Sequence, residues 1–538
     1  MRPTHRVTRA PFRKRCMAML ASAGALTPAL SGAQTVAPVA SVGDERPKPV
    51  QSLAAAIALA YRNNPTLQAT RYDLRSVDER IAQAKAELRM RADAQISAGY
   101  QWNLEGRISR RTNIFGRPFS AQSESQAALS IQQPLYTGGH ATATRRSAEA
   151  SVGAAEQRLR ATEGDLLLSV ISTYMDVYRF RAERDIRAAS VQELHKLLDE
   201  IEARQVAGEL TRTDIAQASG QVAQAEAQLL QAEQSLRSAQ ADFLSVVGAE
   251  IETAAPPPGL PGLPADADRA FFLAAQRSPE LAYARDTAQA SLHDVEAARA
   301  TGRPTVAVRG SAEVNGRAHL PYHLRDQDKA FSSSVVLTVP LVGGGLRASQ
   351  VREASARAQS DRLRIEAAQR ELARVVTDAW NDIATADRIG DVSAQRRSAA
   401  TTQLEGMLAE YRLGLRSTFD LLYAQQTLRD AQVSVLDAER DRYVSRATLL
   451  RRIGTLEAGD LTSGVPLYDP KPAVAAAREA NRLPLDDTVG AIDAIAVPAA
   501  RVHAPTAPAP AKDPMFKPAA PSSASPQPIT PSLRKPHP

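Results

Sequence analysis

The stretch VAGELTRTDIAQA, residues 206–218, returns as RLGLRSTFDLLYA, residues 412–424, at an offset of 206 positions. In each copy a glycine, Gly208 or Gly414, precedes a Thr or Ser by three residues, and an Asp follows three residues later. Glycine readily takes the left-handed conformation that ends a helix. The pattern Ser/Thr-x-x-Asp is a capping box that begins one. Both copies therefore predict a tight turn at the tip of a helical hairpin.

The same offset relates the chain on both sides of these turns. It carries Pro134 onto Pro340 and Gly248 onto Gly454, with no gap from residue 134 to residue 248. Self-similarity at a fixed offset indicates a tandem duplication. The sequence predicts two repeats, over 51–254 and 267–465, joined by a Pro-rich linker at 255–266. The first repeat is expected to contain a β-hairpin at 95–133 and a long helical hairpin at 139–248. The second repeat is expected to contain the corresponding β-hairpin at 305–340 and helical hairpin at 345–454.

The composition favours long, thin helical layers, because aromatic residues make up only 4% and charged residues 23%. Residues 139–205 contain no proline, so a continuous helix of roughly 100 Å is expected from a rise of about 1.5 Å per residue. Apolar residues form one row along it, and the offset reproduces that row in the second repeat, so both copies are expected to bury the same face. Such a hairpin is too thin to bury its apolar row alone, which predicts lateral packing against other hairpins.

The two ends of the chain differ from the repeats. Residues 1–33 combine six basic residues with an apolar run and a small-residue site, as in a cleaved signal peptide, and residues 34–50 read as a flexible tether. The sole cysteine, Cys16, lacks the small apolar neighbours of a lipoprotein site, so no lipid anchor is expected. Residues 466–538 hold 16 of the 34 prolines and predict a disordered tail.

The net charge of +7 does not predict a nucleic-acid partner. The six basic residues within 1–33 have no acidic counterpart there, so removal of this segment leaves +1. A chain that is close to neutral lacks the basic surface that polyanion binding requires.

Two regions alternate with the period of a β-strand. Residues 95–133 and 305–340 each contain two strands of about ten residues, long enough to cross a bilayer when tilted. Tyr100 and Trp102 are placed as membrane-interface aromatics. An ordinary antiparallel hairpin is the alternative for a single copy. Four strands per chain are too few to close a barrel, and a trimer would supply twelve.

No catalytic, cofactor or metal site is predicted. Gly343, Gly344 and Gly345 lack the following Gly-Lys-Ser/Thr of a phosphate loop and favour a junction between strand and helix. His319 and His323 flank a proline in a loop without further ligands at zinc spacing, which favours a solvated loop. Enzymatic function is therefore not expected.

The chain resembles the TolC family of outer-membrane efflux proteins over roughly residues 50–470. The resemblance rests on the signal peptide, the NNP and SP helix breaks at 63–65 and 278–279, QPLYTGG at 133–139 with its copy VPLVGGG at 339–345, and the two glycine turns. The turns and VPLYDP at 465–470 are most similar to type I secretion members. The family implies a mainly α fold with a β portion, located in the outer membrane of a Gram-negative bacterium. Three copies of the chain form a homotrimer with a twelve-stranded barrel in outer-membrane lipid and an α-helical tunnel across the periplasm. It also implies a periplasmic adaptor and an inner-membrane transporter, of the ABC class for type I secretion.

The resemblance also implies a periplasmic gate at the hairpin tips. Matching the motifs places its links at Asp214, with Thr213 adjacent, and at Tyr411 and Arg416. Asp420 matches an acidic ring of the entrance, whereas Tyr423 stands where the family has a second acid, which weakens the expectation of cation selectivity. Helix capping is the simpler role of both aspartates.

Three functions follow from this reading. The first is a passive duct for type I protein secretion. The second keeps the duct but couples it to a proton-driven multidrug pump. The third, from another class, is a periplasmic coiled-coil scaffold without a pore.

Overall fold

The structure is a computed structural model that describes residues 49–103, 120–260, 262–317, 328–462, 468–479 and 486–495. The chain divides into two compact units, residues 1–49 and 50–538. The predicted signal peptide, nearly all of the predicted tether, and the chain beyond residue 495 lie outside the described residues. All the helices and strands that the structure describes belong to the second unit.

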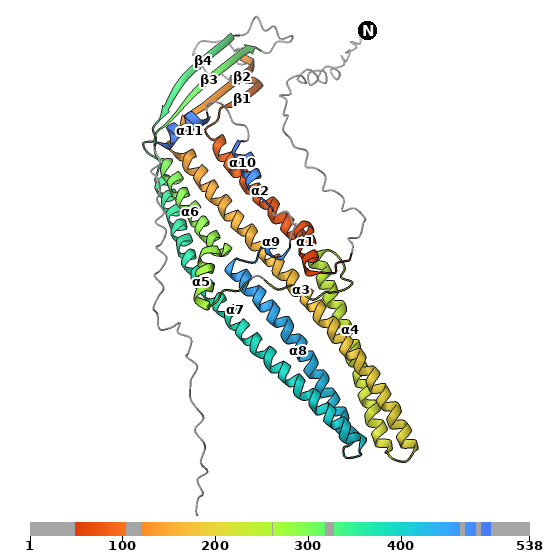
Figure 1. The fold of residues 1–538 in the computed structure, drawn as a ribbon. Coiled ribbons are helices and arrows are strands. Elements are labelled where there is room, and N and C mark those ends of the chain that lie inside the picture. Colours follow the sequence, from red (N-terminus) through yellow and green to blue (C-terminus); the bar gives the residue numbers. More distant parts are fainter. Residues whose placement is uncertain are drawn as a thin grey trace, which may run out of the picture. The chain divides into compact units, whose positions relative to one another are not determined.

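The described elements form two series with the same order of helices and strands (Figure 1). Corresponding helices have equal lengths of 11, 22, 67 and 36 residues. The first series is α1 (Leu53–Asn63), α2 (Pro65–Ala86), β1 (Arg91–Asn103), β2 (Ser120–Tyr136), α3 (His140–Val206) and α4 (Arg212–Val247). The second is α5 (Ala267–Arg277), α6 (Pro279–Ala300), β3 (Thr305–Arg317), β4 (Asp328–Thr338), α7 (Leu346–Arg412) and α8 (Thr418–Ile453).

Helix boundaries follow the glycine and proline signals closely. Both 67-residue helices begin after a left-handed glycine, Gly139 with φ 86° and Gly345 with φ 83°. The proline-free stretch expected at 139–205 is α3, displaced by one residue. Helix α2 ends at Ala86, and from Arg91 onward the chain forms β1, whose first residue pairs with Gln132 of β2.

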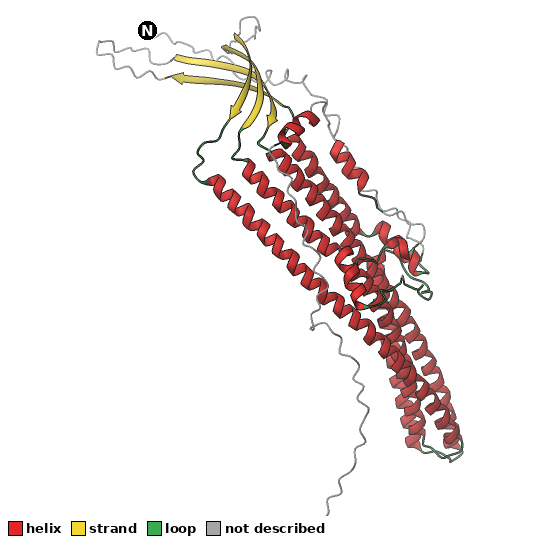
Figure 2. Ribbon diagram, turned by 60° about the vertical axis from the view of Figure 1, so that its left-hand side comes forward, coloured by secondary structure: helices red, strands yellow, loops and turns green. Residues whose placement is uncertain are grey.

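The four strands form one antiparallel sheet in the order β1-β2-β3-β4 (Figure 2). The pairing of β2 with β3 joins the two repeats, with an irregularity between Pro134 and Tyr136, where proline cannot donate a ladder hydrogen bond. Tyr100 and Trp102 occupy backbone positions of β1, but their side chains lie outside the described residues.

None of the helices in the described ranges is both long enough and apolar enough to span a membrane.

The apolar row of the long helices is buried unequally in the two repeats. On α3 it is fully buried, with Tyr174 at 0% exposure, and it packs with residues of α1, α4 and α8. In the corresponding row of α7 only Val376 is buried, while the equivalent of Tyr174, Trp380, is partly buried. The difference arises because α3 contacts α1, α2, α4, α6 and α8, whereas α7 packs mainly on α5, α6 and α8. Both long helices therefore pack the same face inward, as expected, but that face is less completely buried on α7 in the single chain.

The predicted disordered tail is also partly wrong. After the short helix α9 (Ala458–Leu461), the chain forms α10 (Lys471–Glu479) and α11 (Asp486–Ala494), which pack on α2, α3 and β2. Distant residues stabilise these short helices, and composition alone gives no sign of such contacts.

Candidate functional site at the helical hairpin tips

Each helical hairpin turns as the glycine pattern predicts. At the first tip Gly208 has φ 81°, and the amide of Glu209 donates to the carbonyl of Arg204 at 3.0 Å. At the second tip Gly414 has φ 73°, and the amide of Leu415 donates to the carbonyl of Glu410 at 3.0 Å. These bonds satisfy carbonyls at the helix ends that would otherwise lack partners. Glycine is required by its left-handed backbone, since space around both positions is open.

Both capping boxes form. The amide and hydroxyl of Thr211 donate to Asp214 Oδ2 at 2.9 and 2.7 Å, and the amide and hydroxyl of Ser417 donate to Asp420 Oδ2 at 3.2 and 2.9 Å. Hydrogen bonds from the side chain and backbone of Thr211 lower the pKa of Asp214, and those from Ser417 lower the pKa of Asp420. Both aspartates therefore stay ionised at neutral pH and complement the positive ends of their helices.

The two tips share a small apolar core. Its nine buried residues come from both hairpins: Leu194, Leu197, Ile201, Ala218, Val222, Ala225, Tyr411, Leu421 and Leu422. The most polar member is Tyr411, which is only 3% exposed and lies 5.2 Å below the guanidinium of Arg204 in the first hairpin. Its hydroxyl has no hydrogen-bond partner among the described residues. The core thus fixes the two tips side by side within one chain.

The predicted gate residues are neighbours in this region but are not bonded to each other. The carboxylate of Asp214 binds Thr211, and Arg416 Nε binds Glu410 Oε2 at 2.6 Å. In the part of the chain that the structure describes, Asp214 has no hydrogen bond to Tyr411 or Arg416. The hydroxyl of Thr418 makes a smaller contribution to the lowered pKa of Asp214, so Asp214 does face the second tip. Thr213 beside it is exposed.

The charges of the two tips are reversed. In the first, Arg204 at the end of α3 pairs with Glu209 in the turn, with Nε and Oε2 3.0 Å apart. In the second, the equivalent of Arg204 is Glu410, and it pairs with Arg416 in the turn. One tip therefore carries its cation on the helix and its anion in the turn, and the other has the opposite arrangement. If first and second tips alternated around a ring of several copies, each tip would present charges complementary to those of its neighbours.

An apolar patch at the second tip was not anticipated. It consists of four residues that are 59–75% exposed: Leu413, Leu415, Phe419 and Tyr423. The rings of Phe419 and Tyr423 stack with centroids 6.5 Å apart. At the offset of 206 their first-tip counterparts are Ala207, Glu209, Thr213 and Gln217. This comparison of the copies is a sequence signal that could have revealed the patch, and a clustered exposed apolar patch is typical of a contact surface.

The described residues contain no cluster of three or more potential metal ligands. His319 and His323 fall within 318–327, outside those residues. Of the triple glycine, Gly344 and Gly345 have φ 58° and 83° and connect β4 to α7.

Comparisons with known proteins agree on the kind of molecule. A family model described as outer membrane efflux protein matches residues 56–249 and again 272–455. The outer membrane efflux protein BepC of Brucella suis is 28% identical over 426 residues, which are 78% of this chain and 89% of BepC. The alkaline protease secretion protein AprF of Pseudomonas aeruginosa is 24% identical over 410 residues, which are 75% of this chain and 84% of AprF.

The fold is shared with a solved outer-membrane protein. The crystal structure of VceC from Vibrio cholerae aligns with a TM-score of 0.64 at 21% identity and covers 75% of this chain and 96% of VceC. The mainly α arrangement with a small sheet is that of TolC-like channels, which confirms the fold class expected from the sequence.

Proposed function

Because the chain belongs to the outer membrane efflux protein family, we propose that it is the outer-membrane duct of a type I protein secretion system. Three copies form one channel, which receives a polypeptide from an inner-membrane transporter of the ABC class and a periplasmic adaptor. The transporter supplies the energy, and this protein supplies the path. The similarity to AprF, named for secretion of a protease, supports the choice of cargo.

The observation that carries the proposal is the sheet with two unpaired edges. Strands β1 and β4 each pair on one side only within the described chain. An exposed strand edge is a template for another chain. Three sheets joined edge to edge would give the twelve strands of a closed barrel, and the hairpins α3–α4 and α7–α8 would continue it as a tunnel. The half-exposed face of α7 supports the same assembly, because a neighbouring copy would cover it.

A second candidate cargo is a small toxic compound, as in a proton-driven multidrug pump. The name of BepC, an efflux protein, supports this alternative. The two are separated by deleting the gene in its native host. Retention of one specific polypeptide inside the cell supports secretion, whereas sensitivity to small toxic compounds with normal protein export supports the pump.

The scaffold without a pore requires a separate test. A closed barrel resists detergent, so the channel should migrate on gels as a heat-modifiable trimer and fractionate with outer-membrane lipid. A species that is insensitive to heating and found among the unbound periplasmic proteins would support the scaffold.

We further propose that the tips form the gate, with Asp214 of the first tip linked to Tyr411 and Arg416 of the second. Replacing Arg416 by Ser together with Tyr411 by Phe is expected to raise single-channel conductance severalfold in planar bilayers. The hydroxyl of Tyr411 has no partner within the described chain, so its removal costs no bond there. Arg212→Ser is the matched control, since it removes an exposed arginine from the first tip. Equal conductance of the double variant and the control would reject the gate assignment.

A further inference from the structure

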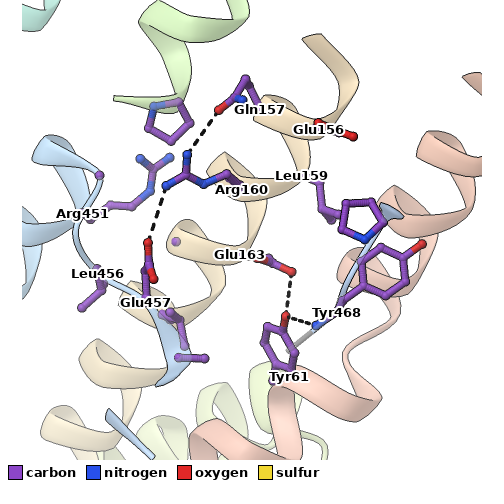
Figure 3. A pocket seen from close by; sticks show the side chains of 16 residues that line it. Tyr61, Glu156, Gln157, Leu159, Arg160, Glu163, Arg451, Leu456, Glu457 and Tyr468 are labelled. Atoms are coloured by element: carbon purple, nitrogen blue, oxygen red, sulfur yellow. Dashed lines mark hydrogen bonds and ion pairs between the residues drawn. The ribbon is translucent and has the colours of Figure 1, made fainter. Parts of the chain in front are cut away.

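Residues 468–479 and 486–495, here together called the strap, begin at a partly buried contact beside α1 and α3. The amide of Tyr468 donates to the hydroxyl of Tyr61 at 3.1 Å, and that hydroxyl donates to Glu163 Oε1 at 2.9 Å (Figure 3). The guanidinium of Arg71 lies 4.6 Å from the ring centroid of Tyr61 and 5.0 Å from that of Tyr468. Tyr61, Glu163 and Tyr468 border a cavity of about 270 Å³. The start of the strap is thus held by hydrogen bonds and by cation–π contacts.

The middle of the strap lies along α2 (Figure 1). Val474 of α10 is 8% exposed and packs in an apolar cluster with Ile81 and Ala84 of α2 and Val152 of α3. Farther along, Asp486 Oδ2 is 3.0 Å from Nε of Arg89, just beyond the end of α2. Both side chains of this ion pair are less than a quarter exposed. The strap therefore follows α2 toward the sheet.

The strap ends with a fully buried carboxylate at the start of α3. Asp493 is 0% exposed. Its Oδ1 accepts from the amide and hydroxyl of Thr137, at 2.7 and 2.8 Å, and from the amide of Gly139 at 3.1 Å. Its Oδ2 accepts from the amide and hydroxyl of Thr142, at 3.2 and 2.9 Å. Burial alone would raise the pKa of Asp493, but these hydrogen bonds outweigh burial and lower it.

The strap provides part of the cap of α3. The N-cap residue Gly139 has no side chain, so Thr137 Oγ1 accepts from the amide of Ala141 and Asp493 Oδ2 accepts from the amide of Thr142. A carboxylate there also meets the positive end of the helix dipole. The second repeat differs: α7 follows Gly345, also without a side-chain cap, and the flanking Val342 and Leu346 are 90% and 63% exposed. The duplication made two helices that begin after a glycine, and among the described residues the main contacts of α11 are with β2 and α3, not with α7.

We propose that residues 468–479 and 486–495 form an intramolecular strap that locks the junction between β2 and α3, with Asp493 as the positioning residue that caps α3. Through Tyr61, the strap links α3 at Glu163 to the first turn of the same helix. It thereby fixes the direction in which the longest helix of the first repeat leaves the sheet. The proposal does not depend on the cargo or on the gate.

The test is hydrogen exchange on the full-length protein, purified as its native oligomer, with peptides covering 134–146 and 340–352. Asp493→Ala is expected to speed exchange in the first peptide roughly tenfold, the size of effect that loss of an N-cap produces. Asp493→Asn should have a smaller effect. Its side-chain carbonyl can still accept the three hydrogen bonds made to Oδ1, but its NH₂ group is a donor and cannot accept those from Thr142. Asp460→Asn, at an exposed carboxylate of α9, is the charge-matched control and should behave as wild type.

The exchange rates of the variants decide the proposal. Faster exchange in 134–146 supports it if the increase is largest for Asp493→Ala, smaller for Asp493→Asn and absent for Asp460→Asn. Exchange in 340–352 must stay at the wild-type rate in all three variants. Since the pKa of Asp493 is lowered, its carboxylate stays ionised. The ratio of the exchange rates of Asp493→Asn and wild type in 134–146 should therefore be constant from pH 8 to pH 5. Unchanged exchange in 134–146 for a folded Asp493→Ala variant would overturn the proposal, and so would an equal increase in both peptides. If the Ala variant does not fold, the Asn variant decides by the same comparison.

Discussion

Gly454→Ala is expected to destabilise the protein far more than Gly248→Ala, although the two glycines are the same position of the two repeats. Both end their helices in the left-handed conformation, with φ 76° and 80°. A Cβ at Gly248 would meet nothing within 4 Å, whereas one at Gly454 would lie 2.3 Å from the carbonyl oxygen of Arg277. At Gly248 only backbone strain is added, about 1–2 kcal/mol. At Gly454 overpacking against fixed backbone adds to it, for a total of roughly 2–5 kcal/mol.

The measurement is chemical unfolding of detergent-solubilised protein, followed by circular dichroism of the helices. The first-repeat variant is the control, because chemistry and backbone conformation are the same at both sites. Similar losses of unfolding free energy in the two variants would show that the contact between α8 and the end of α5 is not as close as the structure has it. The comparison therefore isolates one tertiary contact from the intrinsic cost of alanine with positive φ.

Removing the two acids around Arg451 is expected to destabilise the protein more than removing the arginine itself. The Arg451 side chain is 4% exposed and joins α8 to Asp165 of α3 and to Glu280 of α6, each at 2.8 Å (Figure 3 shows the arginine). The acids are 63% and 47% exposed. Asp165→Ala with Glu280→Ala leaves a buried cation without partners, at about 3–5 kcal/mol. Arg451→Met leaves acids that water can reach, so the cost should be closer to about 1–2 kcal/mol.

Unfolding free energies at pH 7 provide the test, with Glu353→Ala as the control. Glu353 pairs with Arg357 on α7, both are 67% exposed, and such a pair contributes at most about 1 kcal/mol. Burial tends to raise the pKa of Glu280, but Arg451 outweighs it and the pKa is lowered. The stabilisation from Glu280 is therefore complete above its ordinary pKa and is lost as the pH falls through the lowered value. A smaller loss for the double variant than for Arg451→Met would refute the arrangement.

Local chemistry made much of the fold predictable. A left-handed glycine, a capping hydroxyl and an aspartate three residues later define a helical turn without reference to the rest of the chain, and the structure places Gly208 and Gly414 accordingly. The offset of 206 also predicted that both repeats contain the same long helix, and α3 and α7 each have 67 residues. The sequence placed the residues of the proposed gate at the tips, but it did not resolve their contacts. Tyr411 is buried against Arg204, and Arg416 is bonded to Glu410, through packing of the two hairpins on each other.

The sequence by itself determined the duplication, the helix ends and the position of the tips, because those depend on residues a few positions apart. Only the tertiary structure decided how the two copies differ. A Cβ at Gly454 meets Arg277 while one at Gly248 meets nothing, and α3 is buried where α7 is half-exposed. Asp493 caps a helix more than 350 residues earlier in the chain. Residues 466–538 were expected to be disordered because they hold 16 of the 34 prolines, and the stability of the strap comes from partners that no local pattern in the sequence identifies.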